Sequence, residues 1–508
     1  MNMFLSYAVT LLSIYASYVF LYISWSVSRR YAWAARNQGC KAAPMVRSWD
    51  PLLGIDTFVA LRKADFAGRR SEIYKKLHLR YGHTFLMKPL GVVELQTSNS
   101  QNIQAICTSQ FEDFGVGPMR GAIGEPFLSH GIFTDDGDFW KRSRALVRPT
   151  FSRKEISDLG NFESFVVKFL ALIPKDGSEF DLLPLSKKLF LDTSSDFLFG
   201  RSMESLDPDS NAETDEFITS FDRSLLGLAL LLILGPFRWP LYLDPYWKRA
   251  YTKVHVFLDK SVAHALEKKQ EDMADPAQER YVLLEEMAKL NRNPYELRHQ
   301  ILNVFFPAKD TAAIAFANVI FQLARHPFEW DKLRAEVKQI PSDQVLNYEF
   351  IRSLKTTKSI IDESIRLHLP ASRISRIALK DSVLPRGGGP NGESPVFVPK
   401  GTVLEMDLYT MQRDPTVWGD DSNEFKPSRW RQPNRPLWEA KWQYEPFLGG
   451  IRMCPAQNMV FTQVAYLLIR FAQEFKTLEN KDKILEYVEK ITMTVESRNG
   501  VKIGVESV

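Results

Sequence analysis

The segment PFLGGIRMCPAQ, residues 446–457, contains the side chain best suited to chemistry, Cys454. A Gly-Gly turn precedes this cysteine, and a proline and the apolar run NMVFTQVAYLLIRFAQEF follow it. Because proline favours the first turn of a helix, Cys454 is expected at or just before a helix N-terminus. There the helix dipole and free backbone N–H groups stabilise an anion and lower the pKa of the thiol. Taken alone, such a cysteine could be a nucleophile, a redox sensor or an inert core residue.

The pattern F-x-x-G-x-R-x-C that ends at Cys454 closely resembles the haem-binding loop of the cytochrome P450 superfamily. The resemblance implies that Cys454 is the axial iron ligand of a haem b, that Arg452 pairs with a haem propionate and that Phe447 packs beside the sulfur. The family's usual glycine two places after the cysteine is replaced here by Ala456. This departure could tune the iron.

Polar residues at helical spacing match two further motifs of that superfamily. Glu363 and Arg366 share one helix face and resemble the E-x-x-R pair. The segment FKPSRW supplies Arg429, which the resemblance makes the third member of a buried structural charge cluster behind the haem. Trp140 and Arg144 resemble W-x-x-x-R, which implies that both donate to a propionate from one face of a helix turn.

A long helix predicted over Pro294–Arg325 carries Asp310 and Thr311, which align with the A-G-x-D-T oxygen-activation motif. The resemblance implies that this acid and this alcohol relay protons to iron-bound dioxygen. The usual Ala-Gly is replaced by Pro307 and Ala308. Proline removes one helical hydrogen bond and kinks a helix. In the family this helix opens at the motif. The proline therefore either preserves this helix distortion by other means or alters how the enzyme handles dioxygen.

The segment LPASRISR, residues 369–376, aligns with the family segment that runs past the substrate face of the haem. Arg376 lies where the family often has a propionate donor. Arg373 is either a second structural cation or a charge in the wall of the substrate cavity, where it would need a partner. The second alternative predicts an oxygen-bearing lipophile, such as a fatty acid or a terpenoid or polyketide intermediate, in place of a bare alkane.

The chain that must position these residues has 508 residues, of which 45% are hydrophobic and 12% aromatic, so it can bury a large core. Helical patterns dominate between about residues 155 and 367. Short strands are expected at Thr84–Lys88, Val92–Thr97, Val396–Pro399 and Val403–Asp407. The expected class is mainly α with small β-sheets (α+β). The resemblance implies the cytochrome P450 fold, with one haem-thiolate catalytic domain over residues 51–508 and haem between the long central helix and the helix after Cys454.

Two other segments have competing interpretations. The apolar run Leu225–Leu234 would span only about 15 Å as a helix. It is either a buried helix end or an apolar element that dips into a membrane or roofs a substrate cavity. The triplet Gly387–Gly389 suggests a phosphate-binding loop, but no helix follows it, which favours a hairpin turn.

The N-terminus predicts a membrane anchor. No side chain from Phe4 to Val27 is charged, and at about 1.5 Å per helical residue this stretch exceeds the thickness of the bilayer core. Residues 1–28 are therefore expected to be one transmembrane helix and residues 29–50 a basic linker. A cleaved signal peptide is the alternative, but its basic n-region is missing. Basic residues follow the helix and none precedes it, which places the remaining chain in the cytosol.

The resemblance covers nearly the whole chain, and more loosely it favours the fungal branch that includes microsomal alkane and fatty-acid hydroxylases. It implies a monooxygenase of the endoplasmic reticulum membrane that inserts one oxygen atom of O2 into a lipophilic substrate. The implied electron donor is an NADPH-cytochrome P450 reductase, with cytochrome b5 as an optional second donor. The alternatives are a haem-thiolate isomerase or dehydratase that needs no external electrons, and a non-enzymatic haem- or lipid-binding membrane protein.

Three cysteines far apart in the chain favour a reducing compartment, in agreement with the cytosolic placement. The 65 Lys and Arg residues against 61 Asp and Glu residues give a net charge of only +4, spread over the whole length. A nucleic-acid partner is therefore not expected.

Overall fold

The computed structural model describes residues 2–152, 159–208, 212–267, 281–431 and 442–508. The helices are α1 (Asn2–Gln38), α2 (Ile55–Ala67), α3 (Arg70–Tyr81), α4 (Ser100–Cys107), α5 (Gly117–Gly124), α6 (Gly137–Val147), α8 (Gly160–Ala171), α9 (Leu182–Phe199), α10 (Ala212–Leu234), α11 (Pro245–Glu267), α12 (Leu283–Leu290), α13 (Pro294–Arg325), α14 (Pro327–Val337), α15 (Tyr348–Ser353), α16 (Lys355–Leu367), α17 (Leu408–Met411), α18 (Pro415–Trp418) and α19 (Gln457–Glu474). The strands are β1 (Thr84–Met87), β2 (Glu94–Thr97), β3 (Phe114–Gly115), β4 (Phe180–Asp181), β5 (Arg373–Ala378), β6 (Ser382–Gly388), β7 (Ser394–Val398), β8 (Val403–Asp407), β9 (Phe475–Asn480), β10 (Glu489–Ile491), β11 (Val495–Ser497) and β12 (Lys502–Ser507). The predicted class, mainly α with small β-sheets, is confirmed.

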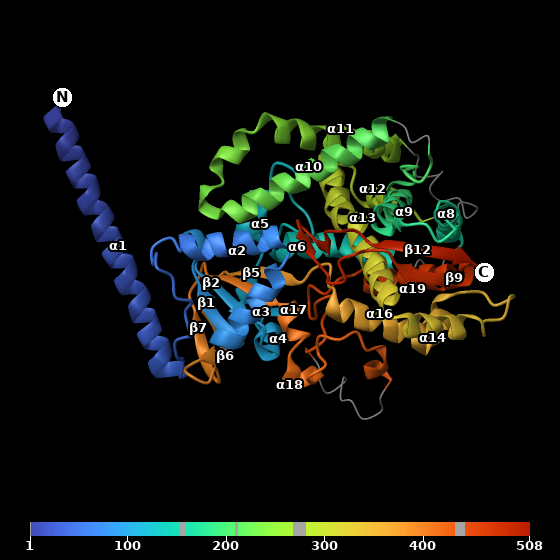
Figure 1. Ribbon diagram of the computed structural model, residues 1–508. Coiled ribbons are helices and arrows are strands. Elements are labelled where there is room, and N and C mark those ends of the chain that lie inside the picture. The colour runs from blue at the N-terminus through green and yellow to red at the C-terminus, as the bar shows by residue number, and fades with distance from the viewer. Residues whose placement is uncertain (1, 153–158, 209–211, 268–280, 432–441) are drawn as a thin grey trace.

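The strands form small sheets at the edge of the helical body (Figure 1). The largest sheet has the order β1-β2-β8-β5-β3, in which β8 pairs in parallel with β2 and antiparallel with β5. The four strands expected from the sequence are all present, with ends that move by one or two residues at most. Strands β6 and β7 pair as a hairpin closed by the glycine triplet, so the hairpin interpretation of Gly387–Gly389 is confirmed.

Helix α13 runs through the centre of the molecule and has the bounds expected from the sequence (Figure 1). The Asn293 side chain accepts hydrogen bonds from the backbone N–H groups of Tyr295 and Glu296 and so caps its start. Its end coincides with His326, because the following Pro327 disfavours a helical residue before it. Most of its side chains are buried on every side, as expected for a core helix.

In the described body of the protein, two helical segments are long and apolar enough to cross a membrane. The most apolar 18-residue window of residues 294–325, the core helix α13, is 72% buried within the fold. The corresponding window of residues 212–237 is only 39% buried. Along α10, Leu225, Leu228 and Leu231 are buried, whereas Leu226, Leu230 and Leu232 are exposed. The buried leucines agree with the buried-helix interpretation of the run Leu225–Leu234. For the exposed leucines, the membrane or substrate-cavity interpretation stays a prediction.

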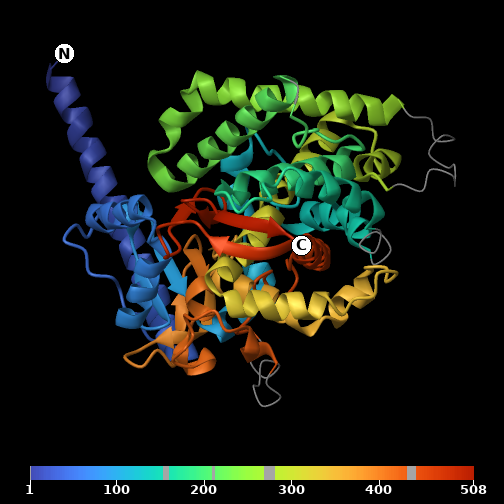
Figure 2. The ribbon, with the colours of Figure 1, turned by 45° about the vertical axis from the view of Figure 1, so that its right-hand side comes forward.

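Helix α1 stands away from the other elements except at its C-terminal end (Figures 1 and 2). The helix continues beyond Val27 to Gln38, so the first part of the expected basic linker, residues 29–50, is helical. Gly39, which has a φ of 65°, ends the helix. Ala34 is fully buried in a small cluster with Phe397 of β7. An ion pair of 2.7 Å joins Arg30 to Asp381. These contacts attach the helix end to the β6–β7 hairpin.

Candidate active site

The loop that carries Cys454 folds tightly against the end of α4. Gly450 has a φ of 75°, and a Cβ at this position would lie 2.1 Å from the carbonyl oxygen of Cys107. The next residue, Ile451, donates its backbone N–H to that same oxygen at 3.1 Å. The N–H of Cys454 donates to the carbonyl of Phe447 at 3.0 Å, and α19 begins three residues later at Gln457. Only glycine fits at position 450, which explains the Gly-Gly turn before the cysteine.

Burial is the largest influence on the Cys454 thiol and raises its pKa. The N–H groups of Ala456 and Gln457 and the charge of Arg144 act in the opposite direction, and the net shift is upward. The sequence-based expectation of a lowered pKa is therefore wrong for the bare thiol, because it considered the helix terminus and not the burial. A coordinated metal cation is the kind of partner that stabilises a thiolate in such a place.

Helix α6 brings aromatic and cationic groups to this loop. Arg144 donates from Nη2 to the carbonyl oxygen of Met453 at 2.7 Å, next to Cys454 in the chain. One turn earlier, the buried Trp140 ring lies 4.6 Å from the guanidinium of Arg452. Arg452 also pairs with Asp136 at 2.6 Å, but its Nε is buried without a hydrogen-bond partner. The structure thus brings Trp140, Arg144 and Arg452 together around the cysteine loop.

Two further arginines add positive charge here. Arg376 of β5 is 4% exposed and uses Nη1 for the backbone carbonyl of Ser375. Burial, with the charges of Arg376 and Arg452, lowers the pKa of Arg120 on α5 well below its ordinary value. Within the described ranges, neither Arg120 nor Arg376 has a carboxylate at ion-pair distance. Arg376 is buried and Arg120 is partly exposed. Cations held in the fold without anionic partners are costly, so this cluster is suited to a bound anion.

A short accessible stretch interrupts the buried middle of α13. Phe306, Pro307, Ala308, Asp310 and Thr311 are all partly exposed, whereas the residues before and after them are almost all buried. The Thr311 hydroxyl donates to the Pro307 carbonyl at 2.9 Å. The helix continues through Pro307 without a break. Polar and apolar side chains of this helix are thus partly accessible side by side.

These three features fit a flat, partly anionic group such as haem. The glycine turn admits close approach, the arginines without carboxylate partners would match propionates, and the accessible stretch of α13 offers a wall that is apolar apart from Asp310 and Thr311. The donor set around Cys454 also matches a thiolate-bound iron.

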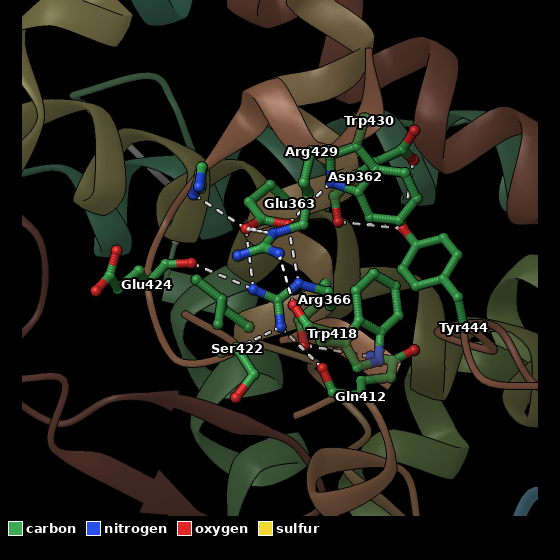
Figure 3. A network of polar contacts seen from close by, with 12 residues as sticks. Asp362, Glu363, Arg366, Gln412, Trp418, Ser422, Glu424, Arg429, Trp430 and Tyr444 are labelled. Carbon is green, nitrogen blue, oxygen red and sulfur yellow. Dashed lines mark hydrogen bonds and ion pairs between the residues drawn. The ribbon is translucent and has the colours of Figure 1, made fainter. Parts of the chain in front are cut away.

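The structure assembles the E-x-x-R pair and Arg429 into one buried cluster (Figure 3). Glu363 accepts two hydrogen bonds of 2.9 Å from Arg366 and one of 2.7 Å from Arg429. Trp430 donates from Nε1 to the same carboxylate at 2.9 Å. Arg366 also donates to the backbone carbonyls of Gln412, Ser422 and Glu424. The cluster therefore fastens α16 to the chain segment that leads into the cysteine loop.

Arg373 lies on the opposite face of β5 from Arg376, because residues three apart in a strand point to opposite sides. Its guanidinium is 3.4 Å from the Tyr74 ring centroid and pairs with Asp407 at 3.4 Å and Glu405 at 3.7 Å. It also donates to Gln96. These contacts favour the structural interpretation. They remove the basis for the hypothesis that Arg373 is a charge in the substrate cavity.

Comparison with known proteins decides which family these features represent. The model of the family described as "Cytochrome P450" matches residues 51–502. The chain belongs to the cytochrome P450 family. Related proteins include cytochrome P450 monooxygenase himC of Aspergillus japonicus, 34% identical over 475 residues, which covers 92% of this chain and 84% of that protein. The cytochrome P450 monooxygenase tenA of Beauveria bassiana is 34% identical over 478 residues, covering 92% of each chain.

Further relatives at 34% identity include cytochrome P450 monooxygenase iliC of Neonectria sp., which shares 481 residues with this chain. The present chain is accordingly a P450 monooxygenase, an enzyme class that uses a haem iron bound by a cysteine thiolate. One residue of the arginine cluster in this P450, Arg120, was not predicted from the sequence. It lies in a short helix rich in glycine, and no motif surrounds it. Only its approach to Arg376 and Arg452 in the fold singles it out.

Proposed function

We propose that this P450 is a membrane-anchored monooxygenase in which Cys454 binds the iron of a haem b. The observation that carries the proposal is the setting of Cys454 among the three cysteines. Cys40 and Cys107 are buried, whereas Cys454 is partly exposed on a loop surrounded by arginines. A ligand needs both an open coordination direction and nearby groups that hold the cofactor.

The chain's own residues account for binding and proton handling. When bound, haem supplies the activation of O2. Arg120, Arg144, Arg376 and Arg452 would neutralise its propionates and orient it, and Trp140 would donate a hydrogen bond to a propionate. The Asp310 carboxylate and the Thr311 hydroxyl lie at the accessible stretch of α13, where they would deliver protons. The Phe133 and Phe306 rings, 5.5 Å apart, would make that stretch more apolar.

The substrate proposed is lipophilic, such as a fatty acid or a terpenoid or polyketide intermediate of fungal specialised metabolism. The aromatic contact of Phe133 with Phe306 on α13 supports it, and the choice no longer depends on Arg373. Electrons would come from an NADPH-cytochrome P450 reductase, with cytochrome b5 as an optional second donor. The 37 residues of α1 extend about 55 Å, enough for a single span of the endoplasmic reticulum membrane with the catalytic domain in the cytosol.

The test uses purified full-length protein reconstituted in lipid with a fungal NADPH-cytochrome P450 reductase. Spectral titration with dodecane, lauric acid and a sesquiterpene first identifies a lipophile that binds. Turnover with 18O2 should then place one labelled oxygen atom in the product, only with NADPH present. Product formation that proceeds without NADPH would support the isomerase or dehydratase alternative. Haem binding without a spectral response to any lipophile would support a sensor or carrier.

Thr311→Ala should preserve haem content and substrate affinity but divert reducing equivalents to hydrogen peroxide. The hydroxyl contributes only one local hydrogen bond, to Pro307, so its loss should act on proton delivery more than on folding. Product formed per NADPH is the measurement, and about a tenfold or larger fall is expected. Thr252→Ala is the matched control, because Thr252 makes the same bond to the carbonyl four residues earlier on the exposed face of α11. An unchanged ratio in Thr311→Ala would show that protons travel by another route.

Deleting residues 1–28 should release a folded, haem-containing protein that still binds membranes weakly. The reason is the group of exposed leucines on α10 together with the exposed side chains Phe237, Trp239 and Leu243 that follow it in the chain. Flotation with phosphatidylcholine liposomes measures the binding. Replacing the exposed Leu226, Leu230 and Leu232 by serine in the truncated protein should abolish flotation and leave the haem spectrum intact. A truncated protein that does not float would mean that this surface does not contact lipid.

A further inference from the structure

The residue between the motif positions Ala308 and Asp310 is a buried lysine. The Lys309 side chain is 8% exposed, yet it carries a charge inside the fold. Its Nζ lies 2.9 Å from Oδ1 of Asp222 and 3.3 Å from Oδ1 of Asp310. Asp222 belongs to α10 and Asp310 to α13. One ammonium group is therefore shared between two helices that are far apart in the chain.

Lys309 lies where α10 packs on α13. The rings of Phe217 and Phe221 on α10 lie 5.8 Å and 5.2 Å from the Phe305 ring on α13. The Lys309 ammonium lies 5.6 Å from the Phe221 ring centroid, on the same contact. The aromatic contact brings the helices together, and the lysine adds a directional bond between them.

The three charged groups differ in their exposure to solvent. The Asp222 side chain is 58% exposed, Asp310 is 14% exposed and Lys309 is buried between them. A buried ammonium without carboxylate partners would be strongly destabilising. Burial lowers the pKa of Lys309, but the carboxylates of Asp310 and Asp222 outweigh burial and the net shift is upward. Loss of either carboxylate therefore leaves Lys309 to depend on the other.

We propose that Lys309 is a positioning residue that fixes the Asp310 carboxylate beside Thr311, and that it does so fully only while Asp222 of α10 shares its ammonium. Packing of α10 on α13 then sets the geometry of the acid that delivers protons. This inference rests on the proposed monooxygenase function. It extends that function by linking an apolar surface helix to the proton-delivering residues.

The test compares four single variants of the full-length, haem-loaded protein. Lys309→Gln removes the charge, Asp222→Asn removes the α10 partner and Lys309→Arg keeps a cation. Glu216→Gln is the matched control, because Glu216 is also on α10, has a side-chain exposure of 57% and pairs with Lys253 of α11 instead of with α13. The measurements are product per NADPH, the solvent isotope effect on product formation and hydrogen–deuterium exchange of the α10 amides.

Lys309→Gln should lower product per NADPH about tenfold, the effect of one lost charge-assisted hydrogen bond, and should raise the solvent isotope effect. Asp222→Asn should act in the same direction and add little in the double variant, because the two residues work through one contact. Both should speed amide exchange around Asp222. Lys309→Arg should keep most of the product formed per NADPH, and Glu216→Gln should leave that quantity unchanged.

Normal product per NADPH in Lys309→Gln, with faster exchange in α10, would overturn the proposal and leave Lys309 a purely structural link. Equal loss in Lys309→Gln and Lys309→Arg would also overturn it, since the charge would then not matter. These outcomes are distinct from failure of the proposed function. That failure would appear in the unmodified protein as absence of NADPH-dependent product.

Discussion

Replacing Cys454 by alanine should abolish the red-shifted Soret band of the reduced, carbon-monoxide-bound protein and all NADPH-dependent product formation. The thiolate is the electron-donating ligand in this family, and no other cysteine lies on a comparable loop. Because Gly450 and Phe447 shape the loop through backbone contacts, the variant should keep the loop conformation. The absorption spectrum of the purified protein is the measurement.

Two control variants separate the loss of the ligand from general damage. Cys40→Ala removes a thiol that is buried beside Phe397, and Cys107→Ala removes one that is buried beside Met406. Both should retain the red-shifted band, since the Cys107 contact to the cysteine loop is made by its backbone carbonyl. Retention of the band in Cys454→Ala would refute the assignment of the ligand.

Replacing Glu363 by glutamine should destabilise the folded protein by about 3–5 kcal/mol and strongly reduce the yield of haem-loaded protein. Arg366 and Arg429 would remain buried with their shared counter-charge removed, and Arg366 is 0% exposed. The midpoint of urea unfolding and the haem content per chain measure the effect. Glu216→Gln is the control, because Glu216 and its partner Lys253 are 57% and 52% exposed and such a pair should contribute only about 0–1 kcal/mol.

The charge cluster around Glu363 also predicts how the stability of the folded protein changes as the pH falls. Burial raises the pKa of Glu363, but its bonds to Arg366 and Arg429 outweigh burial and the net shift is downward. A carboxylate with a depressed folded-state pKa contributes stability above its unfolded-state pKa and loses it as the pH falls through the folded-state value. Unmodified protein should therefore lose stability on acidification more steeply than Glu363→Gln. Equal acid sensitivity of the two would show that Glu363 is not charged in the fold.

The strongest predictions from the sequence concerned features whose cause is local. The bounds of α13 follow from the Asn293 cap and the proline after His326, and both signals lie within four residues of the helix ends. The hairpin at Gly387–Gly389 follows from glycines that adopt positive φ. The spacing of Glu363 and Arg366 guarantees that they share a helix face. That Arg429 completes this charge cluster was implied only by the family resemblance, because Arg429 lies more than sixty residues away from Glu363 in the chain.

Other features depended on partners that no local pattern identifies. Arg373 and Arg376 have the same residue type and nearly the same neighbours in sequence, yet one stacks on Tyr74 and the other faces the arginine cluster. Strand alternation separates their faces, but only the fold shows which face borders the site. The pKa of Cys454 shifted upward because burial, which is a property of the folded chain, outweighed the helix terminus.

The residues suited to chemistry could be identified from short segments, since the cysteine in a Gly-Gly-x-Arg loop, the acid beside an alcohol and the E-x-x-R pair each lie within a few residues. Their roles followed from the family resemblance. Only the tertiary structure decided how those groups are held. The pairing of Lys309 with Asp222 joins residues 87 positions apart, and Arg120 meets Arg376 and Arg452 from a third region of the chain. Electrostatic energies depend on distance in space and on burial, and neither quantity exists before the chain has folded.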